Sequence, residues 1–247
     1  MIINEVYAKT ILSKSKVADY TINPYIGCEH GCTYCYARFM KRLTGHREPW
    51  STFVDVKINA ATLLNREIKK KQPGRVWVSG VCDPYQPIEK KCRITRMCLE
   101  ILSKQDWPVT IQTKSPLVLR DLDLLMKFTE IEAGLTITTA DENIRKIFEP
   151  NSPAISERIE TLEKLHSSGL KTYAMIAPLL PGAEELAALL SDKVDYVLID
   201  RMNYHYANWV YTKYGLEYAI ADKFFREKKE ELARAFERKD MPYQLLF

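Results

Sequence analysis

Three cysteines lie within eight residues of one another near the start of the chain, in the stretch NPYIGCEHGCTYCYARF at residues 23–39. They are Cys28, Cys32 and Cys35, and the next cysteine is Cys82. Thiolates at short spacings bind iron–sulfur clusters, zinc or copper(I). A structural metal site normally takes four protein ligands, and this stretch provides three. The spacing therefore predicts a metal centre with one position left open for a reactant.

The alternative is a structural zinc site closed by His30 or by a distant cysteine. A chain of 247 residues can build its core without a metal, so we favour the open site. We expect His30 to be a packing or hydrogen-bonding residue, and Cys92 and Cys98 to lie in the core, as buried cysteines often do.

Composition indicates an ordinary globular protein, with 46% hydrophobic residues and a formal charge of +4. This charge is too small to indicate nucleic-acid binding by itself. No apolar run approaches the roughly 18–20 residues that span a bilayer, and the N-terminus lacks the apolar segment of a signal peptide. We therefore expect a cytoplasmic protein with no membrane partner, in which the cysteines are ligands, reactive thiols or buried groups rather than disulfides.

Strand-like and helix-like segments alternate along the chain, which predicts parallel strands joined by crossover helices. About six such units fit, fewer than the eight of a complete barrel. The predicted fold class is α/β, an incomplete barrel or a strongly curved sheet. We expect a core over residues 1–200, with a helical C-terminal extension over 201–247 that packs on or closes the barrel. The expected strands are 19–23, 51–58, 75–80, 108–113, 134–139 and 194–200, with a further strand in 170–182 that runs into a proline-rich turn. The expected helices are 59–71, 94–105, 119–131, 152–169, one from about Glu184, and 215–240.

The unusual sequence follows the strands of this prediction. The cysteines follow the first strand, and SGVCDPYQ, TKS, TTADE and APLLPG follow later ones. Active sites of parallel α/β folds form in the loops after the carboxyl ends of strands. We therefore expect all of these segments at one rim of the sheet.

The pattern Cys28-x3-Cys32-x2-Cys35, with Tyr34 before the last cysteine, resembles the motif of radical S-adenosylmethionine enzymes. The resemblance implies a partial (β/α)6 barrel in which the three cysteines hold a [4Fe-4S] cluster. S-adenosyl-L-methionine would bind the fourth iron, which explains the missing ligand. Reductive cleavage would yield a 5′-deoxyadenosyl radical that abstracts hydrogen from a substrate, with an electron donor such as ferredoxin or flavodoxin.

Residues 20–185 resemble more closely the spore photoproduct lyase-like group of that family. True lyases of the group are longer and repair a thymine dimer in DNA. The resemblance implies that Cys82 donates a hydrogen atom to the product radical and that Tyr34 and Tyr36 relay it, although CDPYQ departs from the lyase pattern after this cysteine. A buried apolar thiol is the alternative for Cys82. The segments that carry the resemblance are NPYIGCEHGCTYCYARF, SGVCDPYQPIEKKCRITRMCLEIL, QTKSPLVLRDLDLL, TITTADE and IAPLLPG.

Bound S-adenosylmethionine needs an acceptor for its ammonium group, a cation for its carboxylate, and polar and apolar contacts to its nucleoside. The candidates for these contacts are Ser79, Asp83, Lys114, Thr136, Thr138, Arg158, Ile176 and Pro178. Structural alternatives stay open: Asp83 as a turn former before Pro84, the two threonines as strand formers, Arg158 as an exposed helix residue, and the IAPLLPG segment as a strand-ending turn.

Two further segments are candidates for substrate contacts. Prolines fix the backbone of DPYQPIE (83–89), and we expect them to hold Tyr85 and Gln86 over the rim. The aromatic stretch DRMNYHYANWVYTKYG (200–215), with its Arg201, His205 and Lys213, would stack bases or form a lid, and we favour the lid.

The sequence thus predicts a radical S-adenosylmethionine enzyme that abstracts hydrogen, with a photoproduct lyase-like reaction on DNA as one candidate. A radical enzyme that modifies a small molecule or a peptide is the first alternative. A non-enzymatic nucleic-acid-binding module stabilised by a metal is the second.

Overall fold

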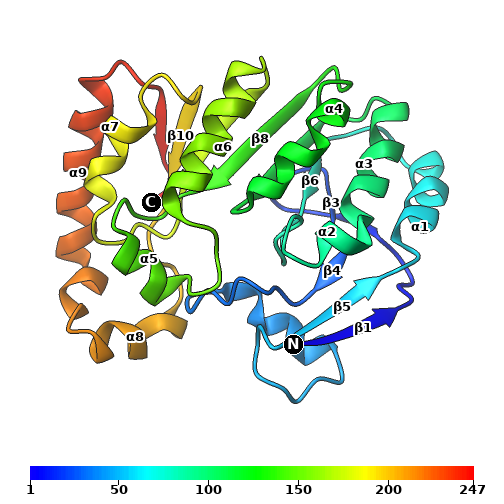
Figure 1. Ribbon diagram of the computed structural model, residues 1–247, viewed down its shortest axis with the longest axis horizontal. Helices are drawn as coiled ribbons and strands as arrows, with labels where there is room; N and C mark the ends of the chain where they lie inside the picture. The colour runs from blue at the N-terminus through cyan, green and yellow to red at the C-terminus, as the bar shows by residue number, and fades with distance from the viewer. The chain divides into compact units, whose positions relative to one another are not determined.

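The computed structural model describes residues 1–247 as a mixed α/β fold (Figure 1). The chain forms two compact units: unit 1 holds Met1–His30 and Ala37–Ala133, and unit 2 holds Gly31–Tyr36 and Gly134–Phe247. The boundary thus passes through the cysteine stretch. None of the helices combines the length and the hydropathy required to cross a lipid bilayer. The division into a core over 1–200 and an extension over 201–247 stays a prediction.

Unit 1 contains the first predicted strands in parallel pairing. Strand β3 (Tyr20–Ile22) pairs with β6 (Val76–Val78), and β6 pairs with β7 (Val109–Thr113). The short β2 (Leu12–Lys14) adds to β3 in the antiparallel sense, so the order is β7-β6-β3-β2. Because β3 and β6 are parallel and in register, their following residues leave the sheet at the same edge. The expected parallel core is confirmed here.

A second sheet of unit 1 was not predicted. It has the order β1-β5-β4, from β1 (Ile2–Val6), β5 (Phe53–Lys57) and β4 (Tyr25–Ile26), and Figure 1 shows β1 beside β5. The expectation that 51–58 is a member of the alternating series is therefore wrong, whereas 19–23 is, as β3, the first strand of the parallel series. Four of the five β5 residues are buried, Asp55 among them, and a short buried strand does not reveal by its own pattern which partner it takes.

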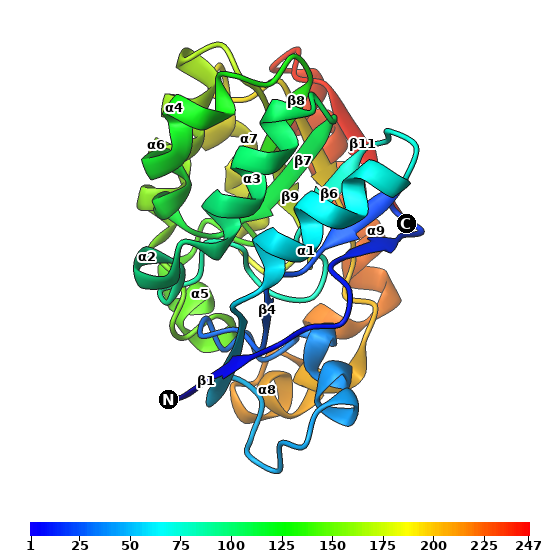
Figure 2. The same ribbon diagram turned by 90° about the vertical axis from the view of Figure 1, so that its right-hand side faces the viewer.

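The helices of unit 1 follow the strands. Helices α1 (Ala60–Glu67) and α3 (Ile94–Lys104) confirm the predictions for 59–71 and 94–105, and they lie side by side, as Figure 2 shows. The helix predicted over 119–131 is only a 3-10 turn η3 (Pro116–Asp121) and α4 (Leu122–Leu125). Residues 131–133 instead begin strand β8 (Ile131–Thr136), three positions before the predicted start. The other elements are η1 (Tyr36–Leu43), η2 (Ile68–Lys70) and α2 (Glu89–Cys92).

Unit 2 continues from the second half of β8. Its strands lie in the order β11-β10-β9-β8, from β9 (Lys171–Ile176), β10 (Tyr196–Ile199) and β11 (Tyr243–Leu245), and both β9 and β11 are parallel to β10. Strand β11 was not predicted. At Gly134 a Cβ atom would lie 2.1 Å from the Tyr173 ring, so this position of β8 accepts only glycine.

The helices of unit 2 include one that matters for the site. Helix α5 (Glu142–Phe148), absent from the prediction, starts at Asp141, whose carboxylate accepts hydrogen bonds from the amides of Asn143 and Ile144. The predicted helix 152–169 is confirmed as α6 (Ile155–Ser167), followed by Gly169 at φ +84°. The predicted helix 215–240 is η6 (Glu217–Ile220) and α9 (Asp222–Glu237). The remaining elements are η4 (Ala183–Glu185), α7 (Leu186–Leu190), η5 (His205–Ala207) and α8 (Asn208–Lys213).

Candidate active site

The first part of the cysteine loop, residues 27–30 of unit 1, is held by one amide side chain. Gln86 Nε2 donates to the Gly27 carbonyl at 3.2 Å, and Gln86 Oε1 accepts from the Glu29 amide at 3.0 Å. These two residues flank Cys28 in the sequence. Gly27 has φ +91°, and a Cβ there would lie 2.2 Å from the Phe53 carbonyl oxygen. The backbone on both sides of Cys28 is therefore fixed.

The expected place of Tyr85 and Gln86 over the rim is wrong. Both residues are fully buried. The prolines turn this segment inward, where the Gln86 amide replaces water as the partner of two backbone groups. The Glu29 carboxylate binds the same segment, accepting from the Ile88 amide at 2.6 Å.

Asp83 connects the cysteine loop of unit 1 to the end of β7. Its Oδ1 accepts from the Tyr85 amide at 2.9 Å and from the Thr113 hydroxyl at 2.6 Å, and its Oδ2 accepts from the Lys114 amide at 2.8 Å. His30 Nε2 lies 3.1 Å from Oδ2, and His30 is buried, as expected of a packing residue. Burial opposes ionisation of Asp83, but His30 and the hydrogen bonds outweigh it and lower the pKa to about 2. The bond from Tyr85 is the turn-forming bond of the structural alternative. Contact of Asp83 or the Lys114 ammonium with a cofactor stays a prediction.

The Cys82 thiol lies in a polar arrangement that depends on Asn23, the residue after β3. Asn23 Oδ1 accepts from the Ser79 hydroxyl at 2.7 Å, the Gly80 amide at 2.9 Å and the Val81 amide at 3.0 Å. Ser79 Oγ lies 3.0 Å from Cys82 Sγ. Burial raises the pKa of the Cys82 thiol to about 11, so the thiol keeps its hydrogen at neutral pH. The alternative of an apolar buried thiol does not describe this environment.

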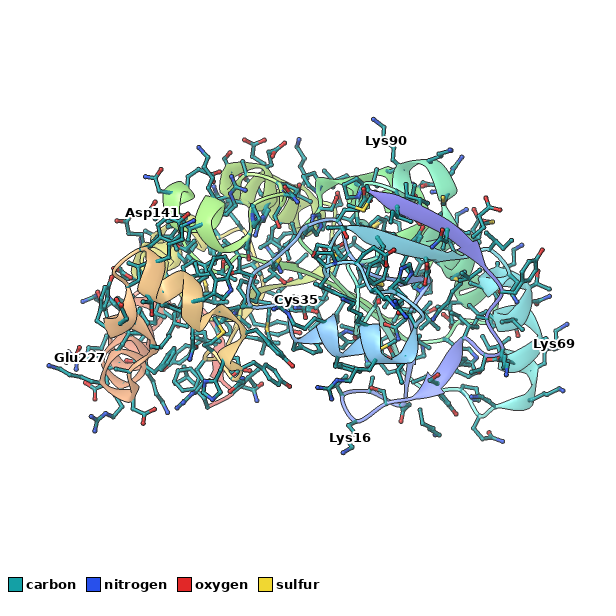
Figure 3. The ribbon with its side chains drawn as sticks, turned by 90° about the horizontal axis from the view of Figure 1, so that it is seen from below. Lys16, Cys35, Lys69, Lys90, Asp141 and Glu227 are labelled. Atoms are coloured by element: carbon teal, nitrogen blue, oxygen red, sulfur yellow. The ribbon has the colours of Figure 1, made fainter.

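The second part of the cysteine loop, residues 31–36 of unit 2, is held by the end of α5. The amide and the hydroxyl of Thr33 both donate to the Phe148 carbonyl, at 2.8 and 3.2 Å. Cys32 Sγ lies 3.9 Å from Ser152 Oγ. The Cys35 amide donates to the Cys32 carbonyl at 3.1 Å and closes a turn, and Figure 3 shows Cys35 where the loop leads into η1.

A buried ion pair fixes Tyr34, which lies between the second and third cysteines. The Tyr34 hydroxyl donates to Glu149, and Arg158 Nη1 lies 2.6 Å from Glu149 Oε2. Both charged side chains are fully buried. The Thr138 hydroxyl donates to Glu149 Oε1 at 3.1 Å. Burial, then Cys32 and Glu149, raise the pKa of Tyr34 well above its ordinary value, so the phenol stays protonated.

Arg158 is not the exposed helix residue of the structural alternative. Besides Glu149, it donates from Nη1 to the Thr136 carbonyl at 3.1 Å, and from Nε and Nη2 to the Pro153 carbonyl at 3.0 and 2.8 Å. This guanidinium ties α6 to β8 within unit 2. Its predicted place near the carboxylate of S-adenosylmethionine stays a prediction.

The remaining candidates of unit 2 occupy different surroundings. Thr136, Thr138, Ile176 and Pro178 are buried, and Thr138 lies beyond the end of β8. Tyr36 is 44% exposed, and its ring stacks on Tyr204 at a centroid distance of 5.8 Å. Tyr204 stacks in turn on Tyr206 at 5.9 Å. Both uses predicted for the aromatic stretch, a lid and a base-stacking surface, stay predictions.

The cysteines themselves are compatible with an iron–sulfur cluster. All six are free thiols, and Cys32 is buried while Cys28 and Cys35 are partly exposed. A donor set of sulfur alone, on one short loop with fixed backbone on both sides of His30, suits iron. Cys98 is buried as predicted, whereas Cys92 at the end of α2 is partly exposed.

The model of the radical SAM superfamily matches residues 22–190. The chain belongs to the radical SAM superfamily. An uncharacterized protein of Methanocaldococcus jannaschii is 37% identical over 217 residues, 87% of this chain and 80% of that protein. An uncharacterized protein of Acidianus two-tailed virus is 32% identical over 171 residues, 66% of this chain and 56% of that protein. Radical SAM proteins use a [4Fe-4S] cluster and S-adenosylmethionine, so the expected cofactors are confirmed.

Solved radical SAM structures confirm the α/β fold class. Spore photoproduct lyase complexed with a dinucleoside spore photoproduct superposes with a TM-score of 0.72 at 16% identity, covering 99% of this chain and 82% of the lyase. Streptococcus suis SuiB bound to its precursor peptide SuiA superposes with a TM-score of 0.63 at 15% identity, covering 92% of this chain and 48% of SuiB. At these identities the likeness concerns the fold.

Of three residues that hold the site, sequence reasoning missed Asn23 and Glu149 and misplaced Gln86. Asn23 had a signal, since an amide directly before Pro24 at the end of a strand often binds a neighbouring turn. Gln86 was expected to lie over the rim, but its side chain is buried. Glu149 follows a helix that the sequence did not reveal, and no local pattern distinguishes it from an exposed glutamate.

Proposed function

We propose that this radical SAM protein is an enzyme with a lyase-like reaction, in which Cys82 returns a hydrogen atom to a carbon radical of the substrate. The observation that carries the proposal is the Cys82 thiol, protonated at neutral pH and in contact with the Ser79 hydroxyl. A thiol must keep its hydrogen to donate it as an atom, and a thiolate has none to give. The free thiols also support the cytoplasm as the compartment.

The cofactors supply, when bound, the 5′-deoxyadenosyl radical that abstracts hydrogen from the substrate. Cys28, Cys32 and Cys35 are the proposed ligands of the cluster. The proposed contacts to S-adenosylmethionine are those of the sequence prediction: Ser79, Asp83, Lys114, Thr136, Thr138, Arg158, Ile176 and Pro178.

The chain's own residues complete the hydrogen balance. When the Cys82 S–H bond breaks, the substrate radical gains the hydrogen and a thiyl radical remains. The thiyl radical takes a hydrogen atom from the hydroxyl of Tyr34 or Tyr36, which becomes a tyrosyl radical. One electron from a ferredoxin or flavodoxin, with one proton from solvent, restores the tyrosine. The Glu149 carboxylate that accepts the hydrogen bond of the Tyr34 hydroxyl is suited to hold this side chain in place during the exchange.

The substrate is proposed to be a DNA lesion that carries planar bases. Support comes from the likeness to a lyase solved with a dinucleoside photoproduct and from the exposed stacked rings of Tyr36, Tyr204 and Tyr206. SuiB, solved with a peptide, has a similar fold, so a peptide is the competing substrate class that the experiments must distinguish from DNA.

Anaerobic reconstitution with iron and sulfide, followed by reduction and chromatography for 5′-deoxyadenosine, tests the first step. The wild type is expected to bind iron and form 5′-deoxyadenosine, Cys32→Ala to form none, and the matched variant Cys92→Ala to behave as the wild type. A wild type without iron, or equal activity in Cys32→Ala, would overturn the assignment.

The role of Cys82 is tested in D2O with the dinucleoside photoproduct as substrate. The thiol exchanges with solvent, so the wild-type product should carry one deuterium, and Cys82→Ala should lose this label and form by-products. An unlabelled wild-type product would refute donation by the thiol. If this substrate is not converted while 5′-deoxyadenosine forms normally, the proposal that the substrate is a DNA lesion is wrong, and the radical SAM assignment stands.

A further inference from the structure

The hydrogen bonds around Cys82 leave one arrangement of hydrogens. The Ser79 hydroxyl has a single hydrogen, and it is donated to Asn23 Oδ1 at 2.7 Å. Ser79 Oγ can therefore only accept from Cys82 Sγ, 3.0 Å away. The thiol hydrogen is thus directed at the serine oxygen, and the serine has no hydrogen left with which to stabilise a thiolate.

Asn23 also fixes the backbone that carries this thiol. The same Oδ1 accepts from the amides of Gly80 and Val81, the two residues between Ser79 and Cys82. The Asn23 carbonyl accepts from Lys57 Nζ at 2.8 Å, which holds the asparagine in turn. One side chain therefore controls both the position of the Cys82 loop and the hydrogen of its nearest polar neighbour.

We infer that Asn23 is a positioning residue for hydrogen-atom donation: it takes the Ser79 hydrogen and holds the backbone before Cys82, so that the thiol hydrogen keeps a defined direction. The inference rests on the proposed role of Cys82 and goes beyond it, since it assigns the control of that thiol to a residue before the cysteine motif.

Three titratable groups face the Cys82 thiol in unit 1. The Lys57 ammonium favours the thiolate, whereas the Asp83 carboxylate opposes it. The Tyr25 phenol, which binds Glu89, carries no charge at neutral pH because burial and Glu89 raise its pKa. None of these groups is changed in the variants below.

The test measures the pKa of Cys82 in cluster-loaded protein, under anaerobic conditions, from the pH dependence of its alkylation by iodoacetamide. Cleavage after Arg75 and Lys90 isolates residues 76–90, which contain Cys82 and no other cysteine, so mass spectrometry reads this thiol alone. Removal of the acceptor in Asn23→Ala frees the Ser79 hydrogen for the sulfur. We expect the thiol pKa to fall by about one unit and alkylation at pH 8 to rise about tenfold.

A double variant separates hydrogen-bond control from simple loosening. Asn23→Ala/Ser79→Ala lacks the freed hydroxyl, so its alkylation should return to the slow rate of the wild type. If the double variant reacts as fast as Asn23→Ala, or if Asn23→Ala reacts as slowly as the wild type, the inference is wrong. Asn59→Ala is the matched control, because this asparagine binds the backbone of Ala8 at 2.9 Å elsewhere in unit 1, and it should not change the rate.

A conservative variant guards against misfolding. Asn23→Asp retains the acceptor oxygen for Ser79, Gly80 and Val81, and its thiol should alkylate no faster than the wild type; faster alkylation would contradict the inference. The 5′-deoxyadenosine assay on the same preparations keeps the two proposals apart. If the wild type forms no 5′-deoxyadenosine, the proposed function is wrong. The alkylation rates of the variants test the positioning role of Asn23 separately.

Discussion

The two parts of the cysteine loop are held by different kinds of interaction. Around Cys28 in unit 1, the neutral Gln86 amide binds both flanking backbone groups. Beside Cys32 and Cys35 in unit 2, Tyr34 is bound to a fully buried glutamate–arginine pair. A neutral amide loses less hydration energy on burial than a charged group does, and each member of a buried ion pair depends on the other. We therefore expect the second part of the loop to be more sensitive to single substitutions.

The largest effect is expected from Arg158→Met, which leaves the Glu149 charge buried without its partner. Loss of one member of a buried pair destabilises a protein by about 3–5 kcal/mol. Urea unfolding measures this change. Iron content after reconstitution should fall with it, because Arg158 no longer holds the Glu149 carboxylate that binds Tyr34.

Two companion variants check the origin of this loss. Arg158→Met/Glu149→Gln removes the unpaired charge and should recover at least half of the stability. Arg234→Met breaks an exposed ion pair with Glu230 and should change nothing measurable. A double variant no more stable than Arg158→Met would show that the charge is not the cause.

A smaller effect is expected from Gln86→Met, which keeps the side-chain volume and leaves the Gly27 carbonyl and the Glu29 amide without partners. The free energy of unfolding should fall by about 2–3 kcal/mol. Hydrogen exchange of the Glu29 amide should accelerate, while that of Thr33 stays unchanged. Gln72→Met, at an exposed glutamine, is the control. Equal acceleration at Glu29 and Thr33 would mean that the two parts of the loop are not held separately.

The smallest effect concerns Asp83, which joins the first part of the loop through His30. Its pKa falls from 3.8 to about 2 on folding, so its contribution to stability is complete above about pH 4 and is lost as the pH falls to 2. The corresponding free energy is about 2 kcal/mol. Acid unfolding of the wild type and Asp83→Asn measures it: the two stabilities should converge between pH 4 and pH 2. Parallel curves would exclude this carboxylate as the titrating group.

Much of the fold and of the metal centre could be predicted from local sequence. The cysteine spacing indicates the family because it follows the first strand of an α/β pattern. Periodic segments such as α3 and β7, or the glycine that ends α6, show their structure within a few residues. Cys82 could also be singled out as a candidate, because it follows a clear strand, and its role stays a prediction.

What escaped prediction depends on partners distant in the sequence. Strand β11 exists because β10 offers it an edge, and its three residues carry no periodic signal. Gln86 turns inward because two backbone groups more than 50 residues away need partners. Glu149 belongs to the site because it accepts a hydrogen bond from Tyr34 and pairs with Arg158, and neither contact is visible in the local sequence. Residue type and spacing reveal which groups can react, while the groups that hold them appear only in three dimensions.

The raised pKa of Cys82 also bears on damage by oxidants. Hydrogen peroxide attacks thiolates, and with a pKa of about 11 only about one molecule in ten thousand carries a thiolate at this position at pH 7. Sulfenic acid should therefore form slowly at Cys82 during exposure to air.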